Sequence, residues 1–178
     1  MGQFLNRMVR AAQLDVTLYE EVEADKGAMK QAMGVVVLSS VAAGIGTMSQ
    51  GGVGRLVLGT VAALIGWYVW AFLTYVVGTK MLPEPQTKAD YGELLRTLGF
   101  ASAPGLLRIL SVFPAFTGIV FLGSSIWMLI AMVVAVRQAL DYQSTVRAVG
   151  VCVIGWLIQA AFLILVMVLG GGAASQQP

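Results

Sequence analysis

The side chains best suited to chemistry in this chain are a few Arg, Asp and Glu residues. The sequence contains no histidine and a single cysteine, Cys152. Without histidine there is no Ser-His-Asp triad, no Cys-His dyad and no His-dependent zinc site. The short signatures of serine hydrolases, zinc proteases, P-loop proteins and dinucleotide-binding enzymes are also missing from the sequence. The sequence therefore predicts a protein that is not an enzyme and that uses no cofactor or metal.

The most distinctive stretch places Pro104 and Arg108 inside an apolar run. Pro104 has no backbone N–H and should kink a helix, while Gly99 and Gly105 allow a neighbouring helix to approach closely. Arg108 would lie about 18 Å along a helix axis from Arg96. An arginine at that depth either snorkels to the headgroups or binds carbonyls, water or a lipid phosphate. Pro104 and Arg108 are therefore candidate functional residues, with snorkelling of Arg108 as the alternative.

A second group of candidates lies in a charged connector and comprises Asp90, Glu93 and Arg96. Asp90 is placed to cap a short helix that contains Glu93 and Arg96. Together with Glu84, the two acids could instead bind a cation or a basic partner. A solvated loop with a capped helix start is the simpler interpretation.

Two more charged groups flank other apolar runs. Arg137 and Asp141 are four residues apart and could pair on one helix face, which indicates a structural role. An acidic patch near the N-terminus could dock basic loop residues or a basic partner, or it could form a solvated helix face. Its members are Glu20, Glu21, Glu23 and Asp25.

An unusually apolar chain has to position these groups. Residues of the AVILMFWYC class make up 58% of the sequence and charged residues 11%, whereas a soluble domain carries roughly 25% charged residues. So few charges cannot cover a surface against water, so the composition predicts an integral membrane protein. The net charge of +2 is too small to indicate a nucleic-acid partner.

Five apolar stretches of about 20 residues are each long enough to cross ~30 Å of hydrocarbon. They predict an all-α fold, a polytopic membrane helical bundle of five transmembrane helices. The expected spans are 31–49, 55–79, 94–113, 116–139 and 148–170, within a membrane domain of residues 31–170. The third is the least regular. Residues 1–30 are expected to form a cytoplasmic amphipathic segment, and residues 171–178 a disordered tail.

Residues 3–24 carry apolar side chains at three- and four-residue steps, which predicts one amphipathic helix. Its apolar face could lie in the bilayer interface, or it could pack on the protein's own helices or on a partner. The pattern favours neither alternative.

The basic residues predict the orientation of the five spans. Nine of the eleven Lys and Arg residues fall on the N-terminal side, and Arg55 and Arg108 fall on the other. Positive charge favours the cytoplasm, so the N-terminus should be cytoplasmic and the C-terminus outside. If residues 94–113 did not span fully, the C-terminus would instead lie inside. All nine acids share the inner side, which concentrates polar chemistry there.

Two segments resemble Yip-domain membrane proteins. One is the acidic run Tyr19-Glu-Glu-Val-Glu before the spans, and the other is Tyr91-Gly-Glu-Leu-Leu-Arg-Thr-Leu-Gly-Phe-Ala-Ser-Ala-Pro104, which looks like the loop-to-third-span motif of bacterial members. The resemblance covers about residues 10–170. It implies five spans, a cytoplasmic N-terminus and a non-enzymatic role in a bacterial inner membrane. The Asp-Leu-Tyr-Gly-Pro pattern of eukaryotic members is not present, so GTPase binding is not implied, and no site residue carries over.

Two functions remain open at this point. The first is a membrane adaptor or scaffold that acts through helix packing and its cytoplasmic face. The second is a small transporter, channel or lipid-handling protein with a polar path near Pro104 and Arg108. The expected partners are membrane lipids and either a second copy or another membrane protein. A tightly packed bundle would favour the first function. The second would be favoured by a cavity lined by Arg96, Ser102, Arg108, Ser124 and Ser125.

Overall fold

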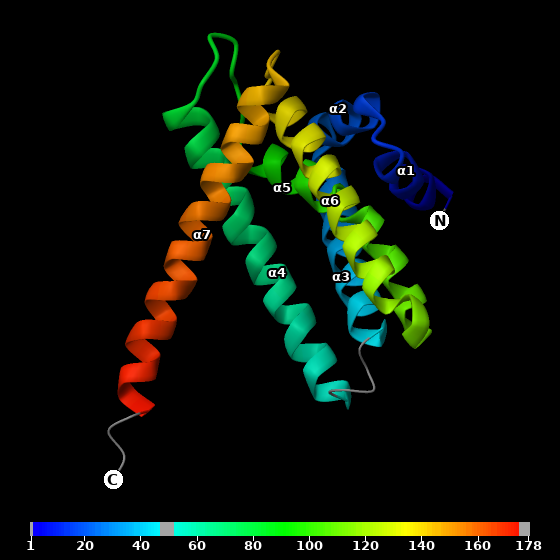
Figure 1. Ribbon diagram of the computed structural model, residues 1–178. Helices are drawn as coiled ribbons and strands as arrows, with labels where there is room; N and C mark the ends of the chain where they lie inside the picture. The colour runs from blue at the N-terminus through cyan, green and yellow to red at the C-terminus, as the bar shows by residue number, and fades with distance from the viewer. Residues whose placement is uncertain (1, 47–51, 175–178) are drawn as a thin grey trace.

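The computed structural model describes residues 2–46 and 52–174, and the regular structure in these residues is entirely helical. Figure 1 shows long helices beside several short ones. The long helices are α3 (Met29–Gly46), α4 (Gly52–Val76), α6 (Thr117–Ala139) and α7 (Thr145–Ala174). The short α-helices are α1 (Gly2–Ala12), α2 (Val16–Ala24) and α5 (Tyr91–Phe100). The remaining elements are η1 (Lys26–Ala28), the π-helical η3 (Val77–Met81), η4 (Ala103–Val112) and η5 (Pro114–Phe116).

Four helices in the described part of the chain are long and apolar enough to cross a membrane. These stretches are Lys26–Ile45, Gly52–Met81, Pro114–Ala139 and Thr145–Phe162. The all-helical membrane fold is thus confirmed, whereas the predicted count of five spanning helices is not. The difference lies in residues 94–113, which form most of α5 and the 3-10 helix η4. Each of these two helices contains ten residues, which is too short to span alone.

The break between α5 and η4 has a local cause in the sequence. Because Pro104 offers no N–H, the α-helical ladder cannot continue through it. Short 3-10 bonds take over instead, from Ser102 N to Gly99 O (3.2 Å) and from Gly105 N to Ser102 O (2.9 Å). In place of the predicted kink at Pro104, the chain changes from the α-helix α5 to the 3-10 helix η4.

The α5–η4 segment nevertheless runs through the bundle beside α3. Gly99 lies against Ala32, and Gly105 lies against Ser39, so the segment runs parallel to α3. Gly105 also lies close to the Met128 sulfur of α6, so the predicted close approach at both glycines is confirmed. The segment is covered on two sides by long helices.

The N-terminal region is two helices, and the prediction of one helix over residues 3–24 was wrong. Leu14 takes a left-handed conformation with φ of 63°, and the Asp15 and Leu14 N–H groups bond back to Arg10 O and Ala11 O, as at many helix C-termini. Asp15 then caps α2 by accepting from Thr17 N. The chain therefore folds back at Leu14.

Helix α2 packs on the protein itself. Leu18, Tyr19 and Val22 are fully buried, and α2 lies against α5 and α6. Of the two alternatives for the N-terminal apolar face, packing on the protein's own helices therefore holds for α2. On α1, Met8 and Ala11 are buried, but Leu5 and Val9 remain exposed.

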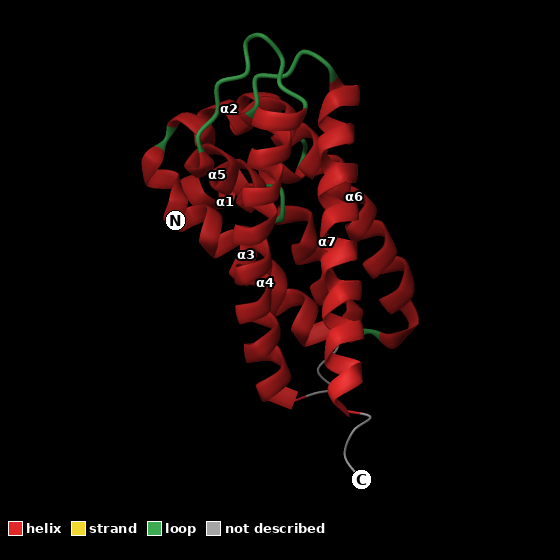
Figure 2. Cartoon of the chain, turned by 90° about the vertical axis from the view of Figure 1, so that its left-hand side faces the viewer, coloured by secondary structure: helices red, strands yellow, loops and turns green. Residues whose placement is uncertain are grey.

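The polar loops gather at one end of the molecule, beside α2, and α4 and α7 diverge from that end (Figures 1 and 2). Helix α7 continues to Ala174, so residues 171–174 are helical and the predicted disordered tail was wrong for them. Residues 175–178 lie outside the described residues.

Large apolar side chains of α4, α6 and α7 face outwards, among them Leu58, Ile119 and Leu157, as expected for lipid-facing helices.

Gly99→Ala should destabilise the fold, because α5 touches α3 directly at this point. An added Cβ would lie 2.7 Å from Ala32 Cβ and 3.1 Å from two Ala32 backbone atoms. Overpacking of this kind costs about 1–3 kcal/mol. The measurement is the midpoint of thermal unfolding in detergent. Gly150→Ala is the control, since its Cβ would meet only Leu82 Cδ1 at an ordinary 3.5 Å, and equal midpoints for both variants would contradict the packing argument.

Candidate functional site

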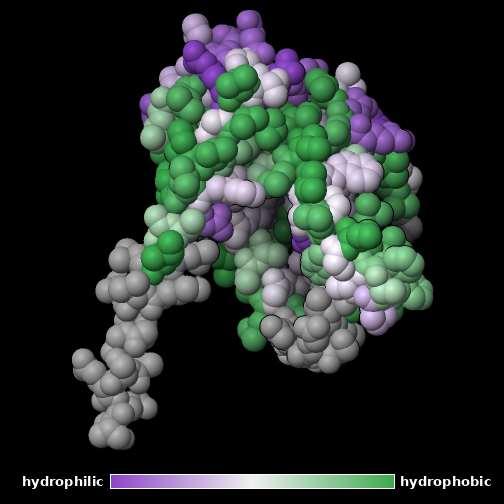
Figure 3. All heavy atoms as spheres, viewed as in Figure 1, coloured by the Kyte–Doolittle hydropathy of each residue, from purple (hydrophilic) through white to green (hydrophobic). Residues whose placement is uncertain are grey.

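A cavity of about 580 Å³ lies inside the bundle, among α3, α4, α6, α7 and η4. Its wall is mostly apolar, and Figure 3 shows a hollow on this side of the molecule, below the polar end. The aromatic and thioether side chains in the wall are Trp67, Trp70, Phe121, Met128, Met132 and Trp156. The polar side chains in the wall are Ser39, Ser40, Ser102, Arg108 and Gln159.

Arg108 supplies the one cationic side chain of the described cavity wall. Its Nε donates to Ser124 Oγ (3.2 Å) and its Nη2 donates to Ser125 Oγ (2.9 Å). The guanidinium carbon lies 5.3 Å from the centre of the Phe121 ring, within cation–π range. These neutral partners orient the guanidinium and leave its charge uncompensated, since no carboxylate in the described part of the chain lies within ion-pair distance of it.

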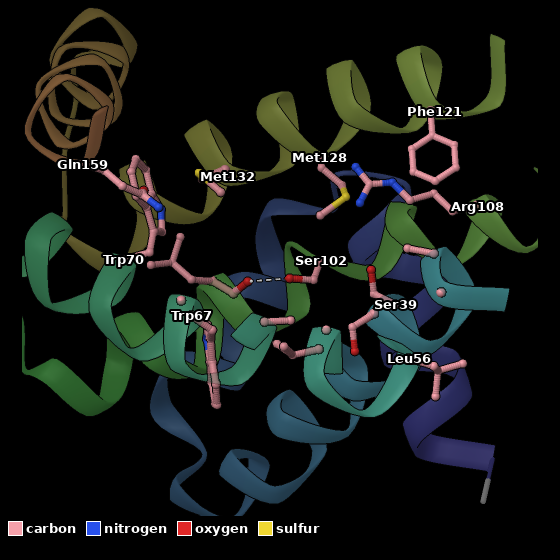
Figure 4. A pocket seen from close by; sticks show the side chains of 18 of the residues that line it. Ser39, Leu56, Trp67, Trp70, Ser102, Arg108, Phe121, Met128, Met132 and Gln159 are labelled. Carbon is pink, nitrogen blue, oxygen red and sulfur yellow. Dashed lines mark hydrogen bonds between the residues drawn. The ribbon is translucent and has the colours of Figure 1, made fainter. Parts of the chain in front are cut away.

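Polar side chains lie at both ends of the cavity, and the wall between them is mostly apolar. Figure 4 shows Arg108 with Phe121 at one end and Trp70 with Gln159 at the other. The Trp70 indole N–H is buried and has no hydrogen-bond partner in the described structure, which is costly for a polar group. Gly59 and Gly66 of α4 line the cavity, and a Cβ added to either would meet nothing within 4 Å. Within this chain, these two glycines make room and do not bring helices together.

Only some of the five residues that were predicted to line a cavity lie together in the structure. Ser102 and Arg108 line the cavity, and Ser124 and Ser125 hold the Arg108 guanidinium. Arg96 does not reach it. Arg96 is buried at the polar end, where its Nε donates to Val22 O (2.9 Å) and its Nη2 donates to Glu23 O. Arg96 therefore fastens the C-terminal turn of α2 to α5.

A second hollow of about 680 Å³ lies at the polar end. It brings together charged residues that are far apart in the sequence, namely Glu20, Glu23, Glu93, Arg137 and Asp141. We call it the acidic cleft. In the described residues, no group of three or more Cys, Asp or Glu side chains has the geometry to hold a metal ion.

The predicted ion pair between Arg137 and Asp141 does not form. Helix α6 ends at Ala139, and Asp141 has a left-handed φ of 53°, so the two residues do not share a helix face. Arg137 Nε donates instead to Tyr142 O at 3.3 Å. Both side chains line the acidic cleft.

Half of the N-terminal acidic patch is paired within the chain. Arg7 is 4% exposed and forms ion pairs with Glu21 (2.8 Å) and Asp25 (2.9 Å). Arg10 binds Glu21 (2.6 Å) and Asp15 (2.7 Å). These contacts hold α1 against α2. Glu20 and Glu23, the other two members of the patch, line the acidic cleft.

The three acids of the connector from η3 to the first turn of α5 bind groups of the protein itself. Asp90 and Glu93 form a reciprocal capping box at the start of α5, so the predicted cap at Asp90 is confirmed. Glu84 Oε2 accepts from Gln143 N at 2.9 Å, and Glu84 also pairs with Arg147. The two loops at the polar end are therefore joined through Glu84.

Glu23 is the most perturbed carboxyl group of the acidic cleft. Burial raises its pKa to about 7, with the nearby charges of Glu93 and Asp141 acting in the same direction and Arg96 opposing them. A carboxyl whose pKa is raised by folding stabilises the fold most at low pH, and this contribution is lost as the pH rises through the folded-state value. Docking of α2 should therefore weaken between about pH 4.5 and 7.

The sequence did not point to Trp70, Gln159 and Met128 as cavity residues. Trp67, Tyr68 and Trp70 were visible only as an aromatic group in the second half of a span, a pattern common at membrane interfaces. Gln159 is the only amide within the last apolar run before residue 170. That isolated polar side chain was the available signal.

Glu23→Gln should raise the midpoint of thermal unfolding at about pH 8 and have little effect at about pH 5. The amide imitates the protonated acid that the cleft favours at low pH. Glu20→Gln is the matched control, because Glu20 lines the same cleft but is exposed. A Glu23→Gln midpoint that follows the wild-type pH dependence would contradict the burial argument.

The comparison with known proteins agrees with the helical membrane fold. The Yip1 domain model matches residues 25–171, from the end of α2 into the last turns of α7. No curated protein and no solved structure matches the chain. Because the match covers most of the sequence, the chain belongs to the Yip1 domain family.

Proposed function

We propose that this chain is a non-enzymatic, multi-pass membrane protein that binds a lipid in its intramembrane cavity. The observation that carries the proposal is the cavity of about 580 Å³ with Arg108 in its wall. A tightly packed bundle would have favoured a scaffold, and the bundle is hollow at this place. The volume falls within the roughly 300–1,000 Å³ common for small-molecule sites.

The composition of the wall supports a lipid over a water-soluble solute. Most of its side chains are apolar, such as Leu56, Ala63, Trp67 and Met132. The neighbouring outer surfaces of α4 and α6 are also apolar, with Leu58 and Leu122 exposed. A lipid chain could pass from the bilayer into the cavity without leaving an apolar environment. Water, by contrast, would meet few polar partners along most of the cavity.

We infer five membrane crossings, with α5 and η4 in series as the third. Ten residues of α-helix and ten of 3-10 helix reach roughly 35 Å together if aligned, which is enough for ~30 Å of hydrocarbon. The parallel register with α3 supports this inference. It is consistent with a cytoplasmic N-terminus, an outside C-terminus and residence in a bacterial inner membrane.

A second function is favoured by the acidic cleft. Glu20, Glu23, Glu93 and Asp141 come together at the polar end from three separate segments, namely α2, α5 and the turn after α6. Glu20 is bound by Gln138 (3.0 Å), but none of the four forms an ion pair in the described structure. A membrane adaptor could bind a basic partner segment there. The same native mass spectra that report bound lipid would also report a second copy or a co-purified membrane protein.

Filling the cavity should expel the lipid. The double variant Gly59→Leu/Gly66→Leu adds two side chains to α4 where there is open space, so folding should be retained while lipid is lost. The measurement is native mass spectrometry of the full chain released from mild detergent. We expect the wild type to carry bound phospholipid and the double variant to carry several-fold less.

The matched control is Gly118→Leu, which also adds a side chain in open space but lies in the first turn of α6, away from the cavity. Its lipid content should equal that of the wild type. Equal lipid content in all three proteins would mean that the cavity is not the binding site. Absence of lipid from the wild type would reject the proposed function itself.

The topology can be tested by labelling a single cysteine at position 175. Ser175→Cys in a Cys152→Ala background should react with a membrane-impermeant maleimide added from outside. Arg10→Cys in the same background should react only after the membrane is opened. Labelling of position 175 only from inside would show that α5 and η4 do not complete a crossing.

A further inference from the structure

The guanidinium of Arg108 has donors that the protein does not use. An arginine carries five N–H donors, and two of them are bound by the hydroxyls of Ser124 and Ser125. The described structure shows no acceptor for the other three. They belong to Nη1 and Nη2, the end of the side chain best suited to bind two oxygens of one anion.

The serine contacts orient the guanidinium without neutralising it. Ser124 is itself fixed, since its hydroxyl donates to Phe121 O at 3.2 Å. The Phe121 ring lies against the guanidinium at 5.3 Å. Three neighbouring residues of α6 thus hold one cation at the cavity wall. In a low-dielectric setting an uncompensated charge is expensive, so a ligand with negative charge would bind here with a large electrostatic gain.

The distribution of charge in the molecule determines which headgroup fits. All nine Asp and Glu residues lie at positions 15–25, 84–93 and 141, in the segments at the polar end. No carboxylate of the described cavity wall is available for a positively charged headgroup. A zwitterionic lipid would therefore place its ammonium group without a carboxylate partner, whereas an anionic lipid has no such cationic group to pair.

The apolar length of the cavity argues for a lipid and against a free anion. From Arg108 the wall continues along Met128 and Met132 to Trp70 (Figure 4). A free phosphate would occupy only the Arg108 end and leave this apolar wall empty. An acyl chain would cover this apolar wall.

We propose that Arg108 selects the headgroup of an anionic phospholipid, whose phosphodiester accepts hydrogen bonds from its Nη1 and Nη2 while the acyl chain lies along α6. This inference rests on the proposed function and adds the charge class of the ligand. It assigns Ser124, Ser125 and Phe121 as positioning residues. They act through the guanidinium and do not themselves touch the phosphate.

The experiment measures lipid selectivity. The full chain is reconstituted in nanodiscs of equimolar phosphatidylglycerol and phosphatidylcholine, and the lipids retained after transfer to mild detergent are counted by native mass spectrometry. The wild type should retain phosphatidylglycerol in preference. In Arg108→Gln the preference should fall about tenfold, as expected for loss of a charge-assisted hydrogen bond.

Two variants separate a headgroup role from a structural one. Arg108→Lys keeps the charge but loses the planar fork, so its selectivity should be intermediate and its fold should be retained. Arg147→Gln also removes one positive charge, but at the exposed polar end, where Arg147 binds Pro83 O and Glu84. Its selectivity should match the wild type. The thermal midpoint of each variant shows whether loss of fold accounts for any change.

Each outcome bears on one claim. Retention of both lipids by Arg108→Gln in the wild-type ratio would overturn the headgroup inference and leave the lipid-binding function intact. Displacement of the retained lipid by inorganic phosphate at matched ionic strength would mean a site for a free anion and would also overturn it. A wild type that retains neither lipid would reject the proposed function, and with it the inference.

Discussion

Gly99 and Gly105 let a segment with broken helical hydrogen bonding lie directly against α3, and this contact fixes much of the molecule. With a Cβ at either position, α5 and η4 would be pushed away from α3. The same contact sets Arg96 near the polar end, where it binds the last carbonyls of α2, and Arg108 near the cavity. One closely packed segment thus carries both Arg96, which binds the N-terminal helix α2, and Arg108, which lies in the cavity wall. The connection requires glycine because only glycine permits this separation between the helices.

Most of the long helices followed directly from composition and length. The predicted spans 31–49, 55–79, 116–139 and 148–170 lie close to α3, α4, α6 and α7, because long apolar runs admit few other structures in lipid. The cap at Asp90 was also readable, since it depends on neighbouring residues alone. The turn at Leu14, where the chain folds back, could not be predicted in this way. Apolar side chains recur at helical spacing on both sides of it, so the periodicity gave no indication of where one helix ends.

The candidate sites also differ in how far the local sequence predicted them. Arg108 stood out in the sequence as an isolated charge, and its partners Ser124 and Ser125 were among the polar residues considered for the cavity. The acidic cleft, in contrast, depends on tertiary folding that brings Glu20, Glu93 and Asp141 together. The expected pair of Arg137 with Asp141 failed for a local reason, because α6 stops two residues before Asp141. Spacing predicts a contact only while the helix continues.

The shortness of α5 and η4 has a consequence for biosynthesis. A chain emerges from the ribosome N-terminus first, so this segment is made before α6, which covers one of its sides. With Pro104, Arg108 and a change of helix type, it is a poor substrate for insertion by hydrophobicity alone. If the segment crosses the bilayer, as proposed above, it would need its contacts with α3, already inserted, and with α6, still to come. In that topology we expect it to insert together with α6, as the first arm of a hairpin, and not as an independent span.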